Sequence, residues 1–293
     1  MFDAEHLRAL AAVLDEGSFD AAAARLHVTP SAVSQRIRAL EQQVGQVLVV
    51  RARPPRPTEA GVVLARLAGQ FAVLERDALA ALRPQDDERW QRLAIAVNAD
   101  SLSTWFPAAL AGLPAGTLVD LRREDQDQTA RLLRDGVVMA AVTADERTVQ
   151  GCRARPLGAM RYVAVAAPRF VGERLAAGPT AAALDEAPMV AFNRDDALQS
   201  RFAQGLVGRS VAAPVHYVPS NAAFVEVLRA GLGWGMAFDA AVADDLASGA
   251  LVELAPGRPL DVPLYWQHWA LRTPALDDLT ARVERAAGAA LRP

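Results

Sequence analysis

The stretch that decides the N-terminal fold is Phe19–Arg56, FDAAAARLHVTPSAVSQRIRALEQQVGQVLVVRARPPR. It predicts an alanine-rich helix that ends near Leu26, followed by a three-residue turn at 27–29. Thr29 is a typical N-cap for a second helix. Pro30 suits the first helical position, because a backbone N–H there would have no intrahelical partner. A short helix, a tight turn and a second helix together predict a helix-turn-helix motif.

The second predicted helix has two different faces. Apolar residues recur in steps of three and four and form a stripe that can pack on neighbouring helices. The opposite face carries hydroxyl, amide and guanidinium groups, which are the types that reach base edges and phosphates in a major groove. An ordinary amphipathic helix has the same spacing, so spacing alone leaves both interpretations open. The apolar residues are Val33, Ile37, Leu40 and Val44, and the polar ones are Ser31, Ser34, Gln35 and Arg38.

The charge around this helix favours a nucleic-acid site. Residues 25–66 contain seven arginines and two acids, a local charge of 7 − 2 = +5 in a chain of net charge −3. Such a basic island indicates a local polyanion site. The run Leu48–Pro57 predicts a short strand and a proline-stiffened wing that carries three arginines. The expected DNA contacts are Ser34 and Gln35 to bases, and Thr29, Ser31, Arg38, Arg51, Arg53 and Arg56 mainly to phosphate or minor groove, with Pro30 beside them.

Composition narrows the remaining classes of protein. The 293 residues allow two domains, and no apolar run is long enough for a membrane helix. The N-terminus lacks the pattern of a secretory signal, and the single cysteine, Cys152, fits a reducing cytoplasm. No metal-ligand spacing, nucleophile–base pair, P-loop or dinucleotide-binding glycine turn is found, so we expect neither a cofactor nor an enzyme.

Two further helices frame the motif. A first helix is predicted at 3–16, ended by Gly17, and a long helix begins behind a Thr58 cap. The long helix carries apolar residues seven apart, as in a coiled-coil seam. This seam can pack on its own domain, but pairing with a second chain is the favoured interpretation. The seam residues are Leu64, Phe71 and Ala78, and Leu67, Leu74 and Ala81.

A polar, proline-containing linker, Arg83–Arg89, separates this part from an α/β pattern. Short apolar strands then alternate with helices, which predicts a parallel sheet with helices on its faces. A helix is expected from about Ser101 to Leu113 and another at Asp239–Ser248.

The chain resembles the LysR-type transcriptional regulators. The similarity is dense over residues 3–66 and includes Gly17-Ser18-Phe19, Val28–Ser34 and Thr58–Gly61, although Pro57 stands where that family usually has an apolar residue. Three further segments resemble the ArgP/LysG branch, whose members sense basic amino acids and control genes such as an amino-acid exporter. These segments are Pro54–Glu59, Ala96–Ser101 and Gly231–Met236.

The resemblance implies a winged helix-turn-helix, a linker helix and a periplasmic-binding-protein-like effector domain of two α/β subdomains. The expected bounds are 1–58 for DNA binding, 59–88 for the linker and dimerisation helix, 89–161 with 268–293 for the first subdomain, and 162–267 for the second.

The effector site is predicted from the topology. Ligands of such sheets bind outside the carboxyl ends of the strands, where several polar residues stand in this sequence. Helix N–H groups after the first strand could receive a carboxylate, and the acids could receive a lysine or arginine side chain. Some of these acids could instead be helix caps. The expected residues are Asn98, Ser101, Glu124, Asp125, Thr143, Asp145, Asn193, Ser220 and Asn221, with Asp125 and Asp145 foremost.

These patterns predict a cytoplasmic regulator that binds promoter DNA and a basic amino acid. It would act as a homo-oligomer, a dimer through the linker helix or a tetramer, together with RNA polymerase and away from membranes. The alternatives are a regulator of the same type with a different small effector, a cytoplasmic solute-binding protein, or an enzyme on the α/β part.

Overall fold

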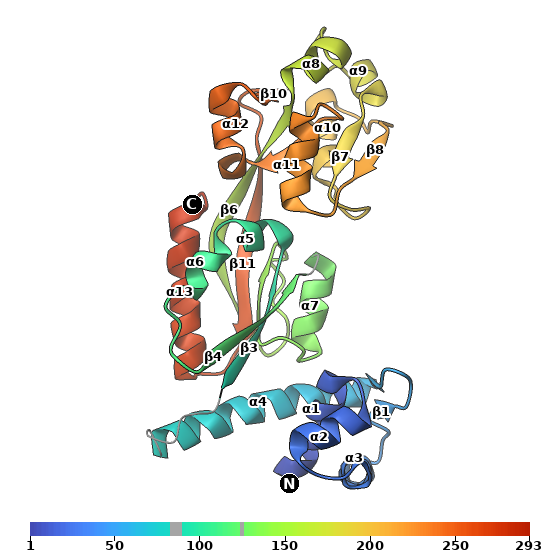
Figure 1. Cartoon of the computed structure of the whole chain (residues 1–293), viewed down its shortest axis with the longest axis vertical. Coiled ribbons are helices and arrows are strands. Elements are labelled where there is room, and N and C mark those ends of the chain that lie inside the picture. Colours follow the sequence, from blue (N-terminus) through green and yellow to red (C-terminus); the bar gives the residue numbers. More distant parts are fainter. Residues whose placement is uncertain (83–89, 124–125) are drawn as a thin grey trace. The chain divides into compact units, whose positions relative to one another are not determined.

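The computed structural model describes residues 1–82, 90–123 and 126–293. Contacts divide it into two units (Figure 1). Unit 1 comprises Met1–Asn98, Ala109–Arg155 and Tyr265–Glu284, and unit 2 comprises Ala99–Ala108, Pro156–Leu264 and Arg285–Pro293. Stretches 99–108 and 285–293 thus lie in unit 2, whereas the expected bounds assign them to the first regulatory subdomain. The domain bounds themselves stay a prediction, and the predicted linker 83–89 lies outside the described residues.

The helix-turn-helix is confirmed, and its helices begin and end where their caps predict. Each N-cap side chain accepts a hydrogen bond from a free N–H of the first turn: Asp3 before α1, Ser18 before α2 and Thr29 before α3. Gly17 ends α1 and Gly45 ends α3 in the left-handed conformation that glycine adopts without steric cost. The helices are α1 (Ala4–Glu16), α2 (Phe19–Leu26) and α3 (Pro30–Val44).

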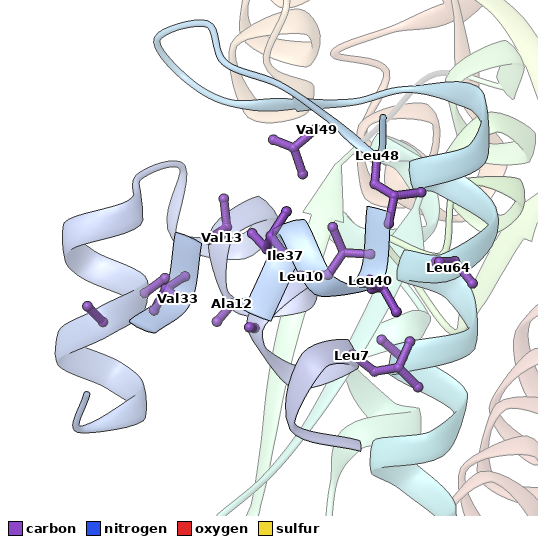
Figure 2. Packing of buried hydrophobic residues seen from close by; sticks show 14 residues of the cluster. Leu7, Leu10, Ala12, Val13, Val33, Ile37, Leu40, Leu48, Val49 and Leu64 are labelled. Atoms are coloured by element: carbon purple, nitrogen blue, oxygen red, sulfur yellow. The ribbon is translucent and has the colours of Figure 1, made fainter. Parts of the chain in front are cut away.

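One apolar core holds these helices together (Figure 2). The stripe of α3 predicted from the sequence packs in this core with Leu7, Leu10 and Val13 of α1, and its last member, Val44, is partly buried. Burial of side chains of this size contributes about 1.5–3 kcal/mol each. This packing orients α3, so the face opposite the stripe is left to solvent. The buried residues of the stripe are Val33, Ile37 and Leu40.

The predicted wing is present as a two-stranded hairpin. Strand β1 (Val49–Val50) pairs antiparallel with β2 (Arg56–Pro57). Helix α4 (Glu59–Leu82) follows at once, with the Thr58 hydroxyl accepting a hydrogen bond from the N–H of Gly61. A Cβ at Gly61 would stand 2.0 Å from the carbonyl oxygen of Leu48, so only glycine lets α4 approach the strand this closely.

We therefore expect Gly61→Ala to lower the free energy of unfolding by roughly 1–3 kcal/mol, the usual cost of overpacking. Chemical denaturation followed by circular dichroism measures this change. Gly205→Ala is the matched control, because no atom lies within 4 Å of a Cβ built there, within an exposed part of a helix. Equal stability of the Gly61 variant and the native protein would contradict this account of the close approach.

Helix α4 has two apolar faces. Leu64 of the predicted seam is buried in the N-terminal core together with its neighbour Ala68, so this end of the seam packs on its own domain. A second stripe stays exposed in the chain, with Leu74 47% accessible. Its members follow one another in steps of four, four and three residues, as on one side of a helix. They are Val63, Leu67, Phe71 and Leu74.

The rest of unit 1 is built on four strands. Strand β3 (Gln91–Val97) lies between β4 (Thr117–Arg123) and β5 (Ala140–Thr143) and is parallel to both. The last residues of β11 (Leu260–Trp269) pair antiparallel with β5. The helices are α6 (Phe106–Leu110), which ends in unit 1, α7 (Gln126–Arg134) and α13 (Pro274–Ala290), whose last residues belong to unit 2.

Unit 2 contains most of the long strand β6 (Cys152–Ala166), which pairs antiparallel with β9 (Gly235–Phe238) and β10 (Val252–Glu253). Strands β7 (Met189–Ala191) and β8 (Val215–Tyr217) form a separate parallel pair. The helices are α5 (Ala99–Ser103), α8 (Pro168–Arg174), α9 (Ala181–Glu186), α10 (Leu198–Val207), α11 (Asn221–Arg229) and α12 (Ala243–Ser248), with a 3₁₀ turn, η1 (Asp239–Ala241).

Three expectations need correction. The sheet is mixed rather than parallel, because β6 and β11 follow connections without a crossover helix, which parallel pairing requires. The helix expected from Ser101 to Leu113 is two short helices. Pro107 lacks the N–H that would bond back into α5, and Thr104 bonds its hydroxyl to the carbonyl of Asp100. The helix expected at 239–248 is likewise divided into η1 and α12.

Candidate functional site

The outer face of α3 and the wing present the side chains that the sequence predicted for DNA. Gln35 and Arg38 are exposed on α3, and Ser34 is partly exposed beside them. Thr29 acts as the α3 cap, and its hydroxyl also lies 2.9 Å from that of Ser31. All the predicted residues are exposed apart from Ser34, which is partly exposed, and their contacts with DNA stay a prediction.

Ion pairs divide the arginines of the basic stretch into two groups. Arg25 pairs with Asp15 and Glu16 at 3.0–3.1 Å, and Arg36 pairs with Glu5 at 2.6 Å. Five others have no acidic partner in the described part of the chain. One of them, Arg66, donates to the Cys152 sulfur at 3.6 Å. The remaining four are Arg38, Arg51, Arg53 and Arg56, the same four that the sequence assigns to DNA. Arg51 lies 5.6 Å from the Phe19 ring, which steadies its side chain at the base of the wing.

In unit 1, three predicted effector residues stand at strand ends. Asn98 follows β3, and its Oδ1 is buried without a hydrogen-bond partner among the described residues. Thr143 ends β5 and accepts a hydrogen bond from the N–H of Asp145, whose Oδ1 accepts from Arg147. Gln267 donates to the carbonyls of Asp145 and Arg147 and so fixes this loop. The Asp145 carboxylate thus supports its own turn through Oδ1, and its other oxygen has no hydrogen-bond partner in the described part of the chain.

In unit 2, two of the predicted residues hold local structure. Ser220 caps α11 through the N–H of Ala223. Asn193 accepts hydrogen bonds from the backbone of Asp195 and Asp196 at 2.9 Å. Ser101 is fully buried, and its hydroxyl lies 3.6 Å from the sulfur of Met160. Glu124 and Asp125 lie outside the described residues.

The structure adds a carboxylate that the predicted set omitted. Asp100 accepts a hydrogen bond from the Tyr162 hydroxyl at 2.6 Å and another from the Asn221 side-chain amide at 2.5 Å. All three residues belong to unit 2, and among them the sequence predicted only Asn221. Asp100 directly precedes a predicted residue, Ser101. Its place in the strand-end segment was the available signal, but that segment was expected to receive the carboxylate of the effector, with the acids at other strand ends.

The carboxyl group of Asp100 has a raised pKa. Burial raises the pKa of its carboxyl, the hydrogen bond from Tyr162 opposes that rise, and the negative charge of Asp196 adds to it. Asp196 itself accepts hydrogen bonds from Phe192 and Gln199. No basic side chain pairs with Asp100 in the parts of the chain that the structure describes. The site therefore has two neighbouring carboxylates and lacks a cation.

Four tryptophans are core residues. Trp105, Trp234, Trp266 and Trp269 are all buried. Within the described residues, no group of three or more His, Cys, Asp or Glu side chains is arranged to hold a metal ion. No described helix is both long and apolar enough to cross a membrane.

A winged helix-turn-helix with unpaired arginines, continued by a long helix and two α/β units, is the architecture of a DNA-binding regulator with an effector domain. Residues 4–62 match the bacterial regulatory helix-turn-helix proteins of the lysR family, and residues 86–288 match the LysR substrate binding domain. The chain belongs to the LysR family, which confirms the resemblance stated from its sequence.

Relatives of known name point to one branch of this family. The HTH-type transcriptional regulator LysG of Mycobacterium tuberculosis is 53% identical over 285 residues, which are 97% of this chain and 93% of that protein. The crystal structure of ArgP from M. tuberculosis superposes with a TM-score of 0.92 at 52% identity, covering 100% of this chain and 99% of that one. Full-length LysG from Corynebacterium glutamicum with bound effector Arg has a TM-score of 0.80 at 37% identity, with 99% and 100% covered.

Proposed function

We propose that this protein is a transcriptional regulator that binds promoter DNA through α3 and the wing and senses a basic amino acid, arginine or lysine. The observation that carries the first part is the set of four unpaired arginines beside the exposed face of α3. Support for the second part comes from the similar LysG with bound arginine and from the cation-deficient carboxylate pair in unit 2. Amino-acid export or metabolism genes are the proposed targets.

The chemistry of unit 2 fits a cationic group of the effector. A guanidinium or ammonium group beside Asp100 would form a charge-assisted hydrogen bond and offset the repulsion from Asp196. The hydrogen bonds from Tyr162 and Asn221 hold the carboxylate in one orientation, so little side-chain freedom is lost when a ligand binds. Asn98, Ser101, Thr143, Asp145, Asn193 and Ser220 remain proposed effector residues, as do Glu124 and Asp125 outside the described residues.

A panel of the standard amino acids tests the sensing step. We expect arginine or lysine to raise the melting temperature of the full-length protein, because a ligand that binds only the folded state stabilises it. A gel-shift experiment with promoter DNA then tests regulation. Tight amino-acid binding without any DNA shift at physiological salt would favour a solute-binding protein. A shift without an amino-acid response would favour a different effector, and turnover of an amino acid would favour an enzyme.

A residue that contacts bases and a residue that contacts phosphates should affect DNA affinity differently when each is substituted. Gln35→Ala is expected to weaken binding to the specific site by about 1–3 kcal/mol, with little loss on unrelated DNA. Arg53→Ala is expected to weaken both kinds of DNA about equally and to reduce the salt slope by about one. Fluorescence anisotropy at several salt concentrations measures both effects. Gln42→Ala, exposed near the end of α3, is the control, and an equal loss of specific binding there would contradict the assignment.

The assembly follows from the same proposal. The exposed stripe of α4 pairs two chains, so two winged helices face half-sites about one helical turn or a multiple of it apart. Residues 1–58 would bind DNA, 59–88 would link and dimerise, and the remaining residues would form the two regulatory subdomains with the bounds given above. Such a regulator acts in the cytoplasm, and RNA polymerase is its expected partner at the promoter.

A further inference from the structure

A polar pocket of about 270 Å³ lies in unit 1, apart from the residues assigned to DNA or effector. Its size is just below the roughly 300–1,000 Å³ of pockets for drug-sized ligands, so it suits a small one. Two arginines line it from alternate positions of β6, which places both side chains on one face of that strand. The lining residues used below are Arg153, Arg155, His268, Arg272, Asp277 and Thr280.

The charge of this pocket favours an anion. Three arginines and two acids line it, which gives 3 − 2 = +1 with His268 neutral. Arg155 is already paired with Glu284 at 2.7 Å. Arg153 and Arg272 have no acidic partner within the described ranges, so their guanidinium groups are available as donors to an oxyanion.

Helix α13 supplies one further donor and one acceptor. The Thr280 hydroxyl accepts a hydrogen bond from the Trp266 indole at 3.1 Å and so keeps its own proton to donate. Asp277 lies on the same face of α13, three residues earlier. Its carboxylate has no hydrogen-bond partner in the described part of the chain and can only accept.

A separate observation that indicates a ligand is the buried side chain of His268. It is 3% exposed, and its Nε2 has no partner among the described residues, which is uncommon for a buried polar atom. Its Nδ1 lies 2.8 Å from the carbonyl oxygen of Trp269. Because a carbonyl only accepts, Nδ1 carries the proton, and the Nε2 of the neutral ring is an acceptor.

The surroundings keep this imidazole neutral. Burial lowers the pKa of His268, the hydrogen bond to Trp269 opposes that change, Arg155 and Arg153 lower it further, and Asp277 raises it. The pocket thus combines guanidinium and hydroxyl donors with a histidine acceptor and a carboxylate acceptor. A suitable ligand has anionic oxygens and also a proton to donate.

We propose that this pocket is a binding site for inorganic hydrogen phosphate. Its anionic oxygens would receive hydrogen bonds from Arg153, Arg272 and Thr280, and its P–OH would donate to Nε2 of His268 or to Asp277. Sulfate and acetate carry no such proton near neutral pH. A phosphate monoester above its second pKa of about 6 has lost its proton as well. The site therefore separates inorganic phosphate from anions of similar size.

Calorimetric titration of the full-length protein at pH 8 and constant ionic strength tests this site. Inorganic phosphate is expected to bind at least about tenfold more tightly than sulfate, acetate or glycerol 3-phosphate, because only its P–OH can donate to His268 or Asp277. Arg272→Gln is expected to weaken phosphate binding by about tenfold or more. Arg285→Gln, on α13 outside the pocket lining, should leave it unchanged and is the matched control.

A second variant tests whether the Nε2 acceptor of His268, and not only the positive charge of the pocket, determines which anion binds. His268→Asn can keep the donor to the Trp269 carbonyl while removing the Nε2 acceptor, so phosphate should lose its advantage over sulfate. Arg53→Gln tests whether phosphate bound at the wing arginines contributes to the heat measured in the titration. Equal affinities for phosphate and sulfate in the native protein would overturn the proposal, as would phosphate binding that Arg272→Gln leaves unchanged.

Discussion

Leu74→Glu is expected to turn the proposed homo-oligomer into a monomer and to remove most of its affinity for a two-part operator. Leu74 belongs to the exposed stripe of α4 and is 47% accessible, so the chain's own core does not need it. In a paired helix the same side chain would be buried. A glutamate there would place an unpaired charge in each half of an apolar contact, which costs several kcal/mol.

The loss of chain pairing should weaken DNA binding, because the two winged helices would no longer be linked. Two linked winged helices bind two half-sites at a high effective concentration, which raises avidity by about 10²–10⁴-fold over one module. Sedimentation analysis should show the monomer, and gel-shift titration should show weaker operator binding. Circular dichroism should show an unchanged helix content, because the chain's own core does not need Leu74. Ala72→Glu adds the same charge at an exposed position of α4 outside the stripe. An oligomer that survives Leu74→Glu would contradict pairing through this helix.

Asp100→Asn is expected to stabilise the ligand-free protein while abolishing most of its amino-acid response. The raised pKa of Asp100 means that the folded state holds its proton more tightly than the unfolded state does. Stability from the protonated form is therefore complete at acid pH and is lost as pH rises through the folded pKa. Asparagine is neutral at every pH and can keep hydrogen bonds to Tyr162 and Asn221. The variant should thus melt higher at neutral pH.

The same substitution removes the charge that a guanidinium or ammonium group would bind. One charge-assisted hydrogen bond contributes about 1.5–3 kcal/mol, so the dissociation constant for arginine or lysine should rise about ten- to a hundredfold. Thermal unfolding from acid to neutral pH and calorimetric titration measure the two effects. Asp244→Asn, exposed on α12, is the control. A less stable variant with an unchanged response would show that Asp100 has a purely structural role.

The elements that local chemistry specifies were predictable. Caps at Ser18, Thr29 and Thr58 and the apolar steps of α3 determine helices whose ends lie where expected, because each depends on neighbours within one or two turns. The break between α5 and α6 was harder to predict. It depends on Pro107 inside an otherwise helical pattern, together with a side-chain bond from Thr104 back to the main chain.

The candidate effector site was predictable only in part. Strand ends located its region, since ligands collect at the carboxyl edge of such sheets. Which carboxylate lacks a partner depends on residues far apart in sequence: Asp100 meets Tyr162 and Asn221 through bonds that span 62 and 121 residues. No local pattern encodes such contacts. In the same way, the support that Gln267 gives to the Asp145 loop depends on a residue more than a hundred positions away.

The separation of paired from unpaired arginines has a consequence for how the protein meets DNA. Four unpaired positive charges per chain lie on the α3–wing face of a protein whose net charge is −3. The duplex therefore repels most of the surface and attracts this face, so an approaching molecule turns its reading helix toward the groove before contact. If two chains each displace four counterions, the logarithm of affinity should fall by about seven per decade of salt. Association would then be fast in dilute buffer and sharply slower as ionic strength rises.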